Sequence, residues 1–314
     1  MRAQSGVALI TAMLVTAIAA IAAVAMMSRQ HLDMRRSENI YAADQAWLFA
    51  SGIETWAMKV LERDRSDNKT DHLGEDWATV LPPIAVEGGV VAGRLEDLQG
   101  RFNLNNLVNE EGLSQADIDM LKRLFDELDI DNQRVQAIVD WVDKDQETGF
   151  PDGAEDNVYL GREPSYRSAD RIMADPSELL LIDGITLEDY QTLSPFVCTL
   201  PARTAVNVNT APAEIVRALV PGMEAGDAEQ LVSEREDNPF TSVEDFNDNA
   251  LVAKYLKNRA PDDNKKTADG TTVSSDYFLL TAAASYGLAE ISMASIINRD
   301  NDGARIIMHQ QGEY

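Results

Sequence analysis

The sequence predicts an α+β fold: a long N-terminal helix packed on a small antiparallel sheet, with a large helical domain inserted between strands. Three observations predict it. An uncharged apolar run over residues 7–27 continues into an amphipathic stripe that ends near Leu61. Residues alternate between apolar and polar near position 90 and again after position 276. Between these two regions the apolar residues recur with the period of amphipathic helices.

The apolar run is long enough to cross a membrane, because about 20 apolar residues span a bilayer core as a helix. A secretory signal is cleaved after its apolar stretch, at a small-residue site. Here the small residues, Ser5 and Gly6, precede the run. Cleavage after Gly6 would leave Val7 as the new N-terminus and keep the helix on the mature chain. The alternative is a plain single-pass anchor that retains its first residues.

The helix is predicted to continue beyond the membrane. From Ser28 to about Leu61 there is no proline and one glycine, Gly52. Apolar residues recur at spacings of three and four, which indicates one helical stripe. Its members are Ile40, Ala43, Trp47, Ala50, Ile53, Ala57, Val60 and Leu61. Residues 7–61 would then form one rod of roughly 80 Å, although two helices with a hinge near Ser28 fit the same pattern.

The chain after this helix predicts strands at its two ends and helices between them. Residues 63–76 are polar and predict a loop. Pro82-Pro83 follow this stretch and exclude a helix at their own position. Strands are expected at 90–98, 277–286, 290–298 and 305–309, with a turn at Asp300–Gly303. Amphipathic helices are expected at 118–128 and 135–142, and Ser114 and Thr210 are candidate N-caps.

The charge balance restricts the partners. The formal net charge is -26, with 53 acidic and 27 basic residues. Such a surface repels nucleic acid and anionic lipid, whose binding depends on Lys and Arg, and favours divalent cations or basic partners.

One cysteine, Cys198, excludes an internal disulfide. No phosphate loop or nucleophile motif marks a catalytic centre, so an enzyme is not expected.

A run of carboxylates and an amide near the middle of the chain is a candidate cation site. Its members are Asp140, Asp143, Asp145, Glu147, Asp152, Glu155, Asp156 and Asn157. Oxygen ligands gathered in a loop with Gly149 and Gly153 suit calcium, which takes six to eight oxygens. The spacing departs from an EF-hand, since position twelve is Ala154. Solvated charges beside a turn are the alternative.

Several motifs together carry a family resemblance. Ser5-Gly6 followed by Val-Ala-Leu-Ile-Thr (7–11) resembles the leader and helix start of type IV pilin-like proteins. Nearly end to end, the chain resembles the K-type minor pseudopilins of type II secretion systems. The motifs are Arg29-Gln30, Gly100-Arg-Phe-Asn-Leu-Asn-Asn-Leu107, Asp140-Trp-Val-Asp-Lys-Asp145, Gly153-Ala-Glu-Asp-Asn157, Pro164-Ser-Tyr-Arg167 and Val206-Asn-Val-Asn-Thr210.

The resemblance implies a division of the chain and a set of sites. The division is a leader at 1–6, the pilin-like helix at 7–65, the first sheet region at 66–108, the inserted helical domain at 109–273 and the last strands at 274–314. A prepilin peptidase would cut between Gly6 and Val7, and Val7 would be methylated. Thr11 replaces the glutamate that major subunits use for docking in the filament. Calcium in the insert would be held by Asp143, Asp145, Glu155 and Asp156, with Asp140 and Asn157 as weaker ligands.

The resemblance also implies a place and partners. The protein would be a single-pass component of the cell inner membrane with a periplasmic ectodomain. It would begin and cap the secretion pseudopilus, with the I- and J-type minor pseudopilins and the major pseudopilin as partners.

A DNA-binding protein on a membrane anchor is the competing hypothesis. Residues 206–246 resemble helix-hairpin-helix domains, and residues 179–186 resemble a weaker copy. In DNA-binding versions the hairpin approaches a phosphate and nearby Lys or Arg neutralise it. Here Glu224 and Asp227 lie on the hairpin, so we expect no nucleic acid among the partners.

Overall fold

The computed structural model describes residues 4–80, 82–256 and 270–312. The helices are α1 (Gln4–Asp67), α2 (Gln115–Glu127), α3 (Val135–Val142), α4 (Asp156–Tyr159), α5 (Leu187–Leu193), α6 (Ala213–Leu219), α7 (Ala225–Asp237), α8 (Val243–Asp248) and α9 (Ala250–Leu256). The strands of the main sheet are β1 (Ile84–Val86), β2 (Gly89–Asp97), β9 (Tyr277–Tyr286), β10 (Ala289–Asp300) and β11 (Gly303–Gln311). Short strands elsewhere are β3 (Phe102–Asn103), β4 (Val108–Asn109), β5 (Gly112–Leu113), β6 (Val197–Cys198), β7 (Val206–Asn207) and β8 (Thr271–Thr272).

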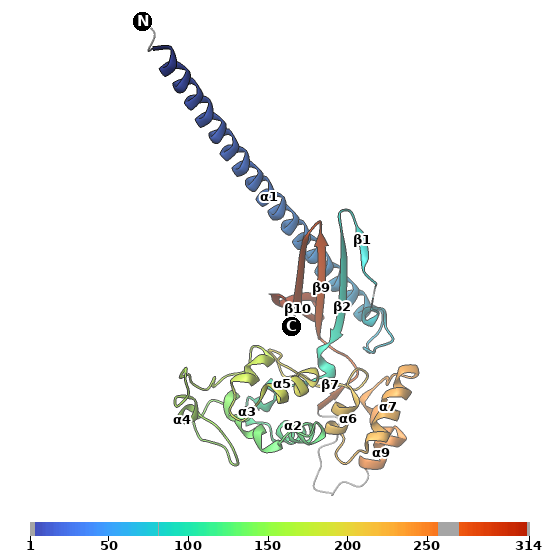
Figure 1. The fold of residues 1–314 in the computed structure, drawn as a ribbon. Helices are drawn as coiled ribbons and strands as arrows, with labels where there is room; N and C mark the ends of the chain where they lie inside the picture. Colours follow the sequence, from blue (N-terminus) through green and yellow to red (C-terminus); the bar gives the residue numbers. More distant parts are fainter. Residues whose placement is uncertain (1–3, 81, 257–269, 313–314) are drawn as a thin grey trace.

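The N-terminal helix is a single element. α1 has 64 residues and no break near Ser28, which makes it about 96 Å long at 1.5 Å per residue. Its first half projects away from the rest of the molecule (Figure 1), and residues 6–41 are exposed. α1 contains the one described segment that is long and apolar enough to cross a membrane. The predicted rod is therefore present. It also extends past the predicted end at Leu61, so residues 63–67 are helix and not loop.

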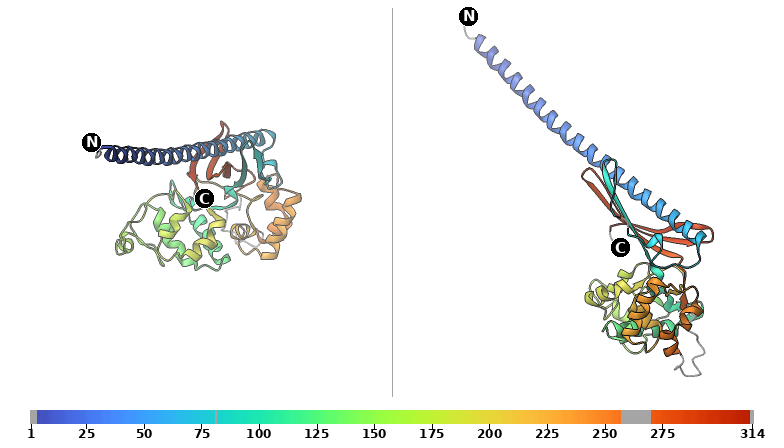
Figure 2. Two further views of the ribbon diagram at one scale, coloured as in Figure 1. Left: turned by 45° about the horizontal axis from the view of Figure 1, so that its top comes forward. Right: turned by 90° about the vertical axis from the view of Figure 1, so that its right-hand side faces the viewer.

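The main sheet is antiparallel in the order β1-β2-β9-β10-β11. Its neighbours β2 and β9 are far apart in the sequence, and their register pairs Leu95 with Leu280. The chain between them, residues 98–276, is called the insert below. It lies beyond the end of the sheet, on the side of the molecule opposite the N-terminus (Figures 1 and 2). The α+β fold class with a helical domain between strands is thus confirmed. The edge strand β1 was not predicted, because it is short and follows two prolines.

Alternation along the strands gives the sheet two buried faces. Phe278, Leu280 and Met293 pack against α1, whereas Leu279 and Ala294 pack against Leu200 of the insert. Ile296 and Ile297 of β10 continue this alternation onto the two faces, and the register shift beside them leaves Ile307 of β11 without a paired residue. The sheet is therefore the layer that joins the helix to the insert.

The face of α1 that meets the sheet differs from the predicted stripe. Its buried residues are Ala46, Ala50, Glu54, Ala57 and Leu61. Ile40 and Ala43 are exposed, because the sheet begins only after them. Glu54 was not predicted: its Oε1 accepts a hydrogen bond from Ser295 Oγ at 2.5 Å and lies 2.8 Å from His309 Nδ1. Glu54 can be buried in this apolar stripe because Ser295 of β10 and His309 of β11 supply polar partners for its carboxylate.

Most buried apolar residues in the described part of the insert form a hydrophobic core that runs from Phe102 to Val252 and includes residues of α2, α3, α6 and α7. A buried polar network ties the insert to the sheet. Asp97 Oδ2 accepts hydrogen bonds from Ser275 Oγ at 2.6 Å, Thr210 Oγ1 at 2.6 Å and Asn207 Nδ2 at 3.0 Å. The two ends of the insert also meet, since Asp276 N donates to Gln99 Oε1 at 2.7 Å.

Of the two predicted N-caps, Ser114 is confirmed in position and Thr210 is wrong. Thr210 does not cap α6, whose N-cap is Pro212, because its hydroxyl is used on Asp97. Ser114 occupies the N-cap position of α2 but makes no side-chain bond to the helix backbone. Its hydroxyl donates to the Asp117 carboxylate, which also pairs with Arg203.

Candidate functional site

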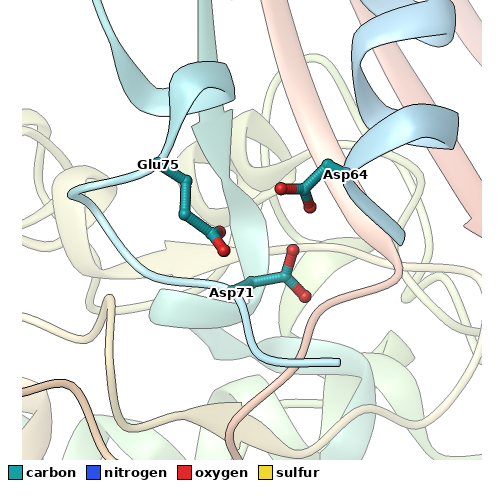
Figure 3. A group of neighbouring side chains, drawn as sticks. All are labelled: Asp64, Asp71 and Glu75. Carbon is teal, nitrogen blue, oxygen red and sulfur yellow. The ribbon is translucent and has the colours of Figure 1, made fainter. Parts of the chain in front are cut away.

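Two groups of three carboxylates come close enough together to hold a cation, among the residues that the structure describes. The first joins the end of α1 to the loop that follows it (Figure 3): Asp64, Asp71 and Glu75 point toward one another. Arg299 of β10 already neutralises this group. Its Nη1 lies 2.8 Å from Asp64 Oδ2, and its Nη2 lies 2.6 Å from Asp71 Oδ1. Glu75 accepts from Trp77 Nε1 at 2.6 Å and from Asn68 Nδ2 at 2.6 Å. This group is a structural ion cluster.

The second group is Asp143, Asp145 and Glu155, and it lies within the predicted cation loop. One oxygen from each falls within 4.8 Å of the others. Asp143 follows the last residue of α3, and Glu155 precedes the first residue of α4. Asp143 Oδ1 and both Glu155 carboxylate oxygens are buried without a hydrogen-bond partner among the described residues. Buried carboxylate oxygens normally have partners, so these three atoms fit a bound cation.

The electrostatics of the group agree with that fit. Burial, reinforced by the charges of Asp145 and Asp140, raises the pKa of Asp143 to about 6. Burial also raises the pKa of Glu155 to about 7, with Asp140 and Asp143 adding to the effect. Negative charges held together in a dry site destabilise each other unless a cation neutralises them.

The other predicted ligands lie around this group with different partners. Asp140 Oδ1 accepts from Gln136 Nε2 at 3.0 Å, and its Oδ2 accepts from Gly149 N at 2.9 Å. Asp156 Oδ1 accepts from Ser168 N and its Oδ2 pairs with Arg167, both at 3.1 Å. Asn157 is exposed. The structure therefore brings together three of the six predicted ligands, and Asp140 shapes the loop beneath them.

Sequence reasoning missed one neighbour, Asp170. Its charge contributes to the raised pKa of both Asp143 and Glu155. Its carboxylate accepts from Ser168 Oγ at 2.6 Å and from Gln146 Nε2 at 2.9 Å. Asp170 lies outside the acidic run. Its position just after the family motif Pro164-Ser-Tyr-Arg167 was the one feature of the sequence that could have pointed to it.

The loop accepts no side chain at Gly153. A Cβ there would lie 2.3 Å from Asp140 Oδ2 and 2.4 Å from Gly149 O. We expect Gly153→Ala to destabilise the protein by about 1–3 kcal/mol, because the loop must move away from Asp140. Thermal unfolding of the full chain in detergent micelles measures this. Gly161→Ala is the matched control, since its Cβ would meet only Val158 O, at 3.4 Å; equal effects of the two substitutions would contradict the prediction.

At the N-terminus, Gly6 and Val7 lie in the exposed first turns of α1. Residues 1–3 of the predicted leader lie outside the described residues. Thr11 Oγ1 donates to Val7 O at 3.1 Å and to Ala8 O at 3.0 Å. Its hydroxyl is thus satisfied within its own helix, and the position carries no charge.

The helix-hairpin-helix segment contains α6 and α7 joined by a short turn that includes Gly222 at φ 80°. Two cations near the hairpin, Arg217 and Lys254, are paired with acids. Arg217 pairs with Glu127, and Lys254 Nζ lies 2.9 Å from Asp227 Oδ2. A phosphate approaching the hairpin would compete with these carboxylates.

A membrane-length helix whose second half packs on an antiparallel sheet defines the class of pilin-like subunits. Two family models, both described as type II secretion system protein K, match residues 100–202 and 206–264. The chain is 35% identical to type II secretion system protein K of Pseudomonas aeruginosa, over 99% of this chain and 94% of that protein. It is 29% identical to the protein K of Klebsiella pneumoniae, over 99% of this chain and 97% of that protein. The chain belongs to the type II secretion system protein K family.

A solved structure agrees with this assignment. A chain in the crystal structure of the GspK-GspI-GspJ complex from the enterotoxigenic Escherichia coli type 2 secretion system matches with a TM-score of 0.76. The two chains are 26% identical, and the match covers 90% of this chain and 100% of that one. The minor pseudopilin class predicted from the sequence motifs is confirmed.

Proposed function

We propose that this protein forms the tip of a type II secretion pseudopilus, where it initiates and caps filament assembly for protein export across the outer membrane. The observation that supports this is the position of the insert, at the end of the molecule opposite the anchor (Figure 1). A helical body of this size above the sheet would block another subunit from stacking there. Thr11 adds support, since an uncharged side chain gives no carboxylate for docking on a subunit above. The role is structural, not catalytic.

Location of the insert in assembled filaments tests the tip role. Glu188 on α5 is exposed, whereas the single cysteine, Cys198, is buried. A Glu188→Cys variant can therefore be labelled with maleimide-coupled gold at one site. We expect electron micrographs to show one gold particle at one end of each filament, and none with the parent chain. Gold distributed along the filament would rule out the cap.

We further propose that the anchor is processed and lies in the inner membrane, with the insert and the sheet in the periplasm. Intact-mass measurement on protein from its native membrane checks this. We expect loss of residues 1–6 and a methyl group on Val7, because prepilin peptidase would cut after Gly6. A retained Met1 would make α1 an ordinary anchor.

The proposed partners are the I- and J-type minor pseudopilins and the major pseudopilin. The structural neighbour in the GspK-GspI-GspJ complex supports the first two. The net charge of -26 and the paired cations near the hairpin argue against nucleic acid.

We propose calcium as a structural cofactor of the insert. Asp143, Asp145 and Glu155 would hold it, and the three unpartnered buried oxygens support this choice. An all-oxygen ligand set suits a hard cation, and a transition metal would prefer imidazole or thiolate. When bound, the ion would neutralise three carboxylates and fix the end of α3 to the start of α4.

A further inference from the structure

A buried arginine in the insert lacks an acidic partner. The structure buries two arginines among the described residues, Arg235 and Arg299. Arg299 is neutralised by Asp64 and Asp71. Arg235, in the last turn of α7, is 5% exposed, and its one described hydrogen bond joins Nη1 to Val208 O at 2.5 Å. Its guanidinium therefore keeps unused donors.

Those donors face a cavity. Arg235 lines a hollow of about 270 Å³ together with Leu73, Gly74, Asn209, Val232 and Glu236. Among the described residues, Nε and Nη2 of Arg235 have no hydrogen-bond partner, and the side chain is part of the wall of this hollow. The cavity lies between α7 and the loop that follows α1, where the insert meets the body of the molecule.

A buried cation without an ion-pair partner is costly. The charge of Glu236 offsets part of this cost for Arg235, but no described acid lies within ion-pair distance of its guanidinium. Burial lowers the pKa of Arg235 to about 10, so the group stays charged at neutral pH. The position of Arg235 near the C-terminal end of α7 is favourable for a cation. The carbonyl of Val208 uses Nη1 alone. Nε and Nη2 have no described acceptor, and two parallel N–H donors of this kind match a carboxylate.

We propose that this cavity binds a monovalent carboxylate through Arg235. The walls select the chemical class. Leu73 and Val232 are aliphatic and suit an acid with an apolar substituent. Glu236 is exposed and lines the same hollow, and it would repel a doubly charged phosphate more strongly than a monovalent carboxylate. The same chemistry occurs in a small free acid and in the C-terminal residue of a protein chain.

Thermal unfolding of the full chain in detergent micelles, with three probes at constant ionic strength, tests the site. The probes are acetate, N-acetyl-leucine and the uncharged N-acetyl-leucinamide. We expect N-acetyl-leucine to stabilise the protein saturably with a Kd in the millimolar range, as a ligand of about a dozen heavy atoms with one charged contact allows. At ten times Kd the unfolding equilibrium constant should fall about 11-fold. The amide should give no saturable effect.

Arg235→Met should remove the response, and the exposed Arg171→Met is the matched control that keeps it. Val232→Phe fills the cavity and retains Arg235, so it tests the site even if Arg235→Met does not fold. Tighter binding of N-acetyl-leucine than of acetate would show that the aliphatic walls take part in recognition, as binding of a protein C-terminus requires. Equal binding would exclude the protein C-terminus and leave a small acid. A response that survives both Arg235→Met and Val232→Phe, or no saturable response in the parent, would overturn the proposal.

Discussion

Arg299→Leu should destabilise the protein by about 3–5 kcal/mol, because it leaves the buried carboxylate of Asp71 and the half-buried carboxylate of Asp64 without their counter-ion. Arg299 is 1% exposed, and it bonds to Asp64, Asp71, Leu61 O and Ser275 O. These partners come from the end of α1, the loop after it and the residues just before β9. One side chain thus joins the anchor helix to the sheet, and its loss leaves polar groups of three segments unpaired.

Equilibrium unfolding of the full chain in detergent micelles measures this effect. Trp77 is a suitable fluorescent reporter, since it is buried and its ring centroid lies 5.1 Å from that of Phe278. Arg305→Leu is the matched control: its pair with Asp300 is exposed and should contribute less than about 1 kcal/mol. If the two substitutions lower the free energy of unfolding equally, Arg299 does not join the anchor helix to the sheet in the way described.

Removal of calcium should also cause a large loss of folding stability. At 100 to 1,000 times its Kd, a cation that binds only the folded chain stabilises it by about 2.7–4.1 kcal/mol. Chelation should lower the thermal midpoint of the insert, followed through Trp141, which is buried close to α4. Calcium, restored in excess, should recover it.

The double substitution Asp143→Asn/Glu155→Gln should have opposite effects on stability with and without calcium. With calcium present, the variant should be less stable than the parent, because two ligands have lost their charge. In chelator, it should be at least as stable, because the burial of two charges and their repulsion, which raise the pKa of Asp143 and Glu155, are gone. Glu110→Gln/Glu111→Gln makes the same change of charge at exposed positions and should keep the calcium response. A parent protein indifferent to chelator would refute the cofactor proposal.

The sequence predicted the parts of this fold whose signals are local. The strands β9, β10 and β11 follow from alternation and from the turn at Asp300–Gly303, and α3 begins and ends where its apolar pattern does. The group of Asp143, Asp145 and Glu155 was predictable because its members are near one another in the chain.

The missed features depend on residues distant in sequence. Glu54 is buried only because Ser295 and His309 meet it from the far end of the chain. Thr210 looks like a helix cap until Asp97, which precedes the insert, takes its hydroxyl. Prediction from periodicity assumes that charged residues are exposed and that a cap residue bonds to its own helix. It cannot detect partners that the topology brings together.

The contact between the two ends of the insert has a kinetic consequence. Pairing β2 with β9 directly would close a loop of roughly 180 residues, at an entropic cost of about 4–5 kcal/mol. A folded insert removes most of that cost, because Gln99 and Asp276 are already held together. Sheet formation would then wait for the insert to fold. During synthesis α1 emerges first, and its apolar face is covered only by β2 and the segment around Trp77 until β9, β10 and β11 follow. Any cation that speeds folding of the insert would shorten the time for which the newly made anchor helix is left uncovered.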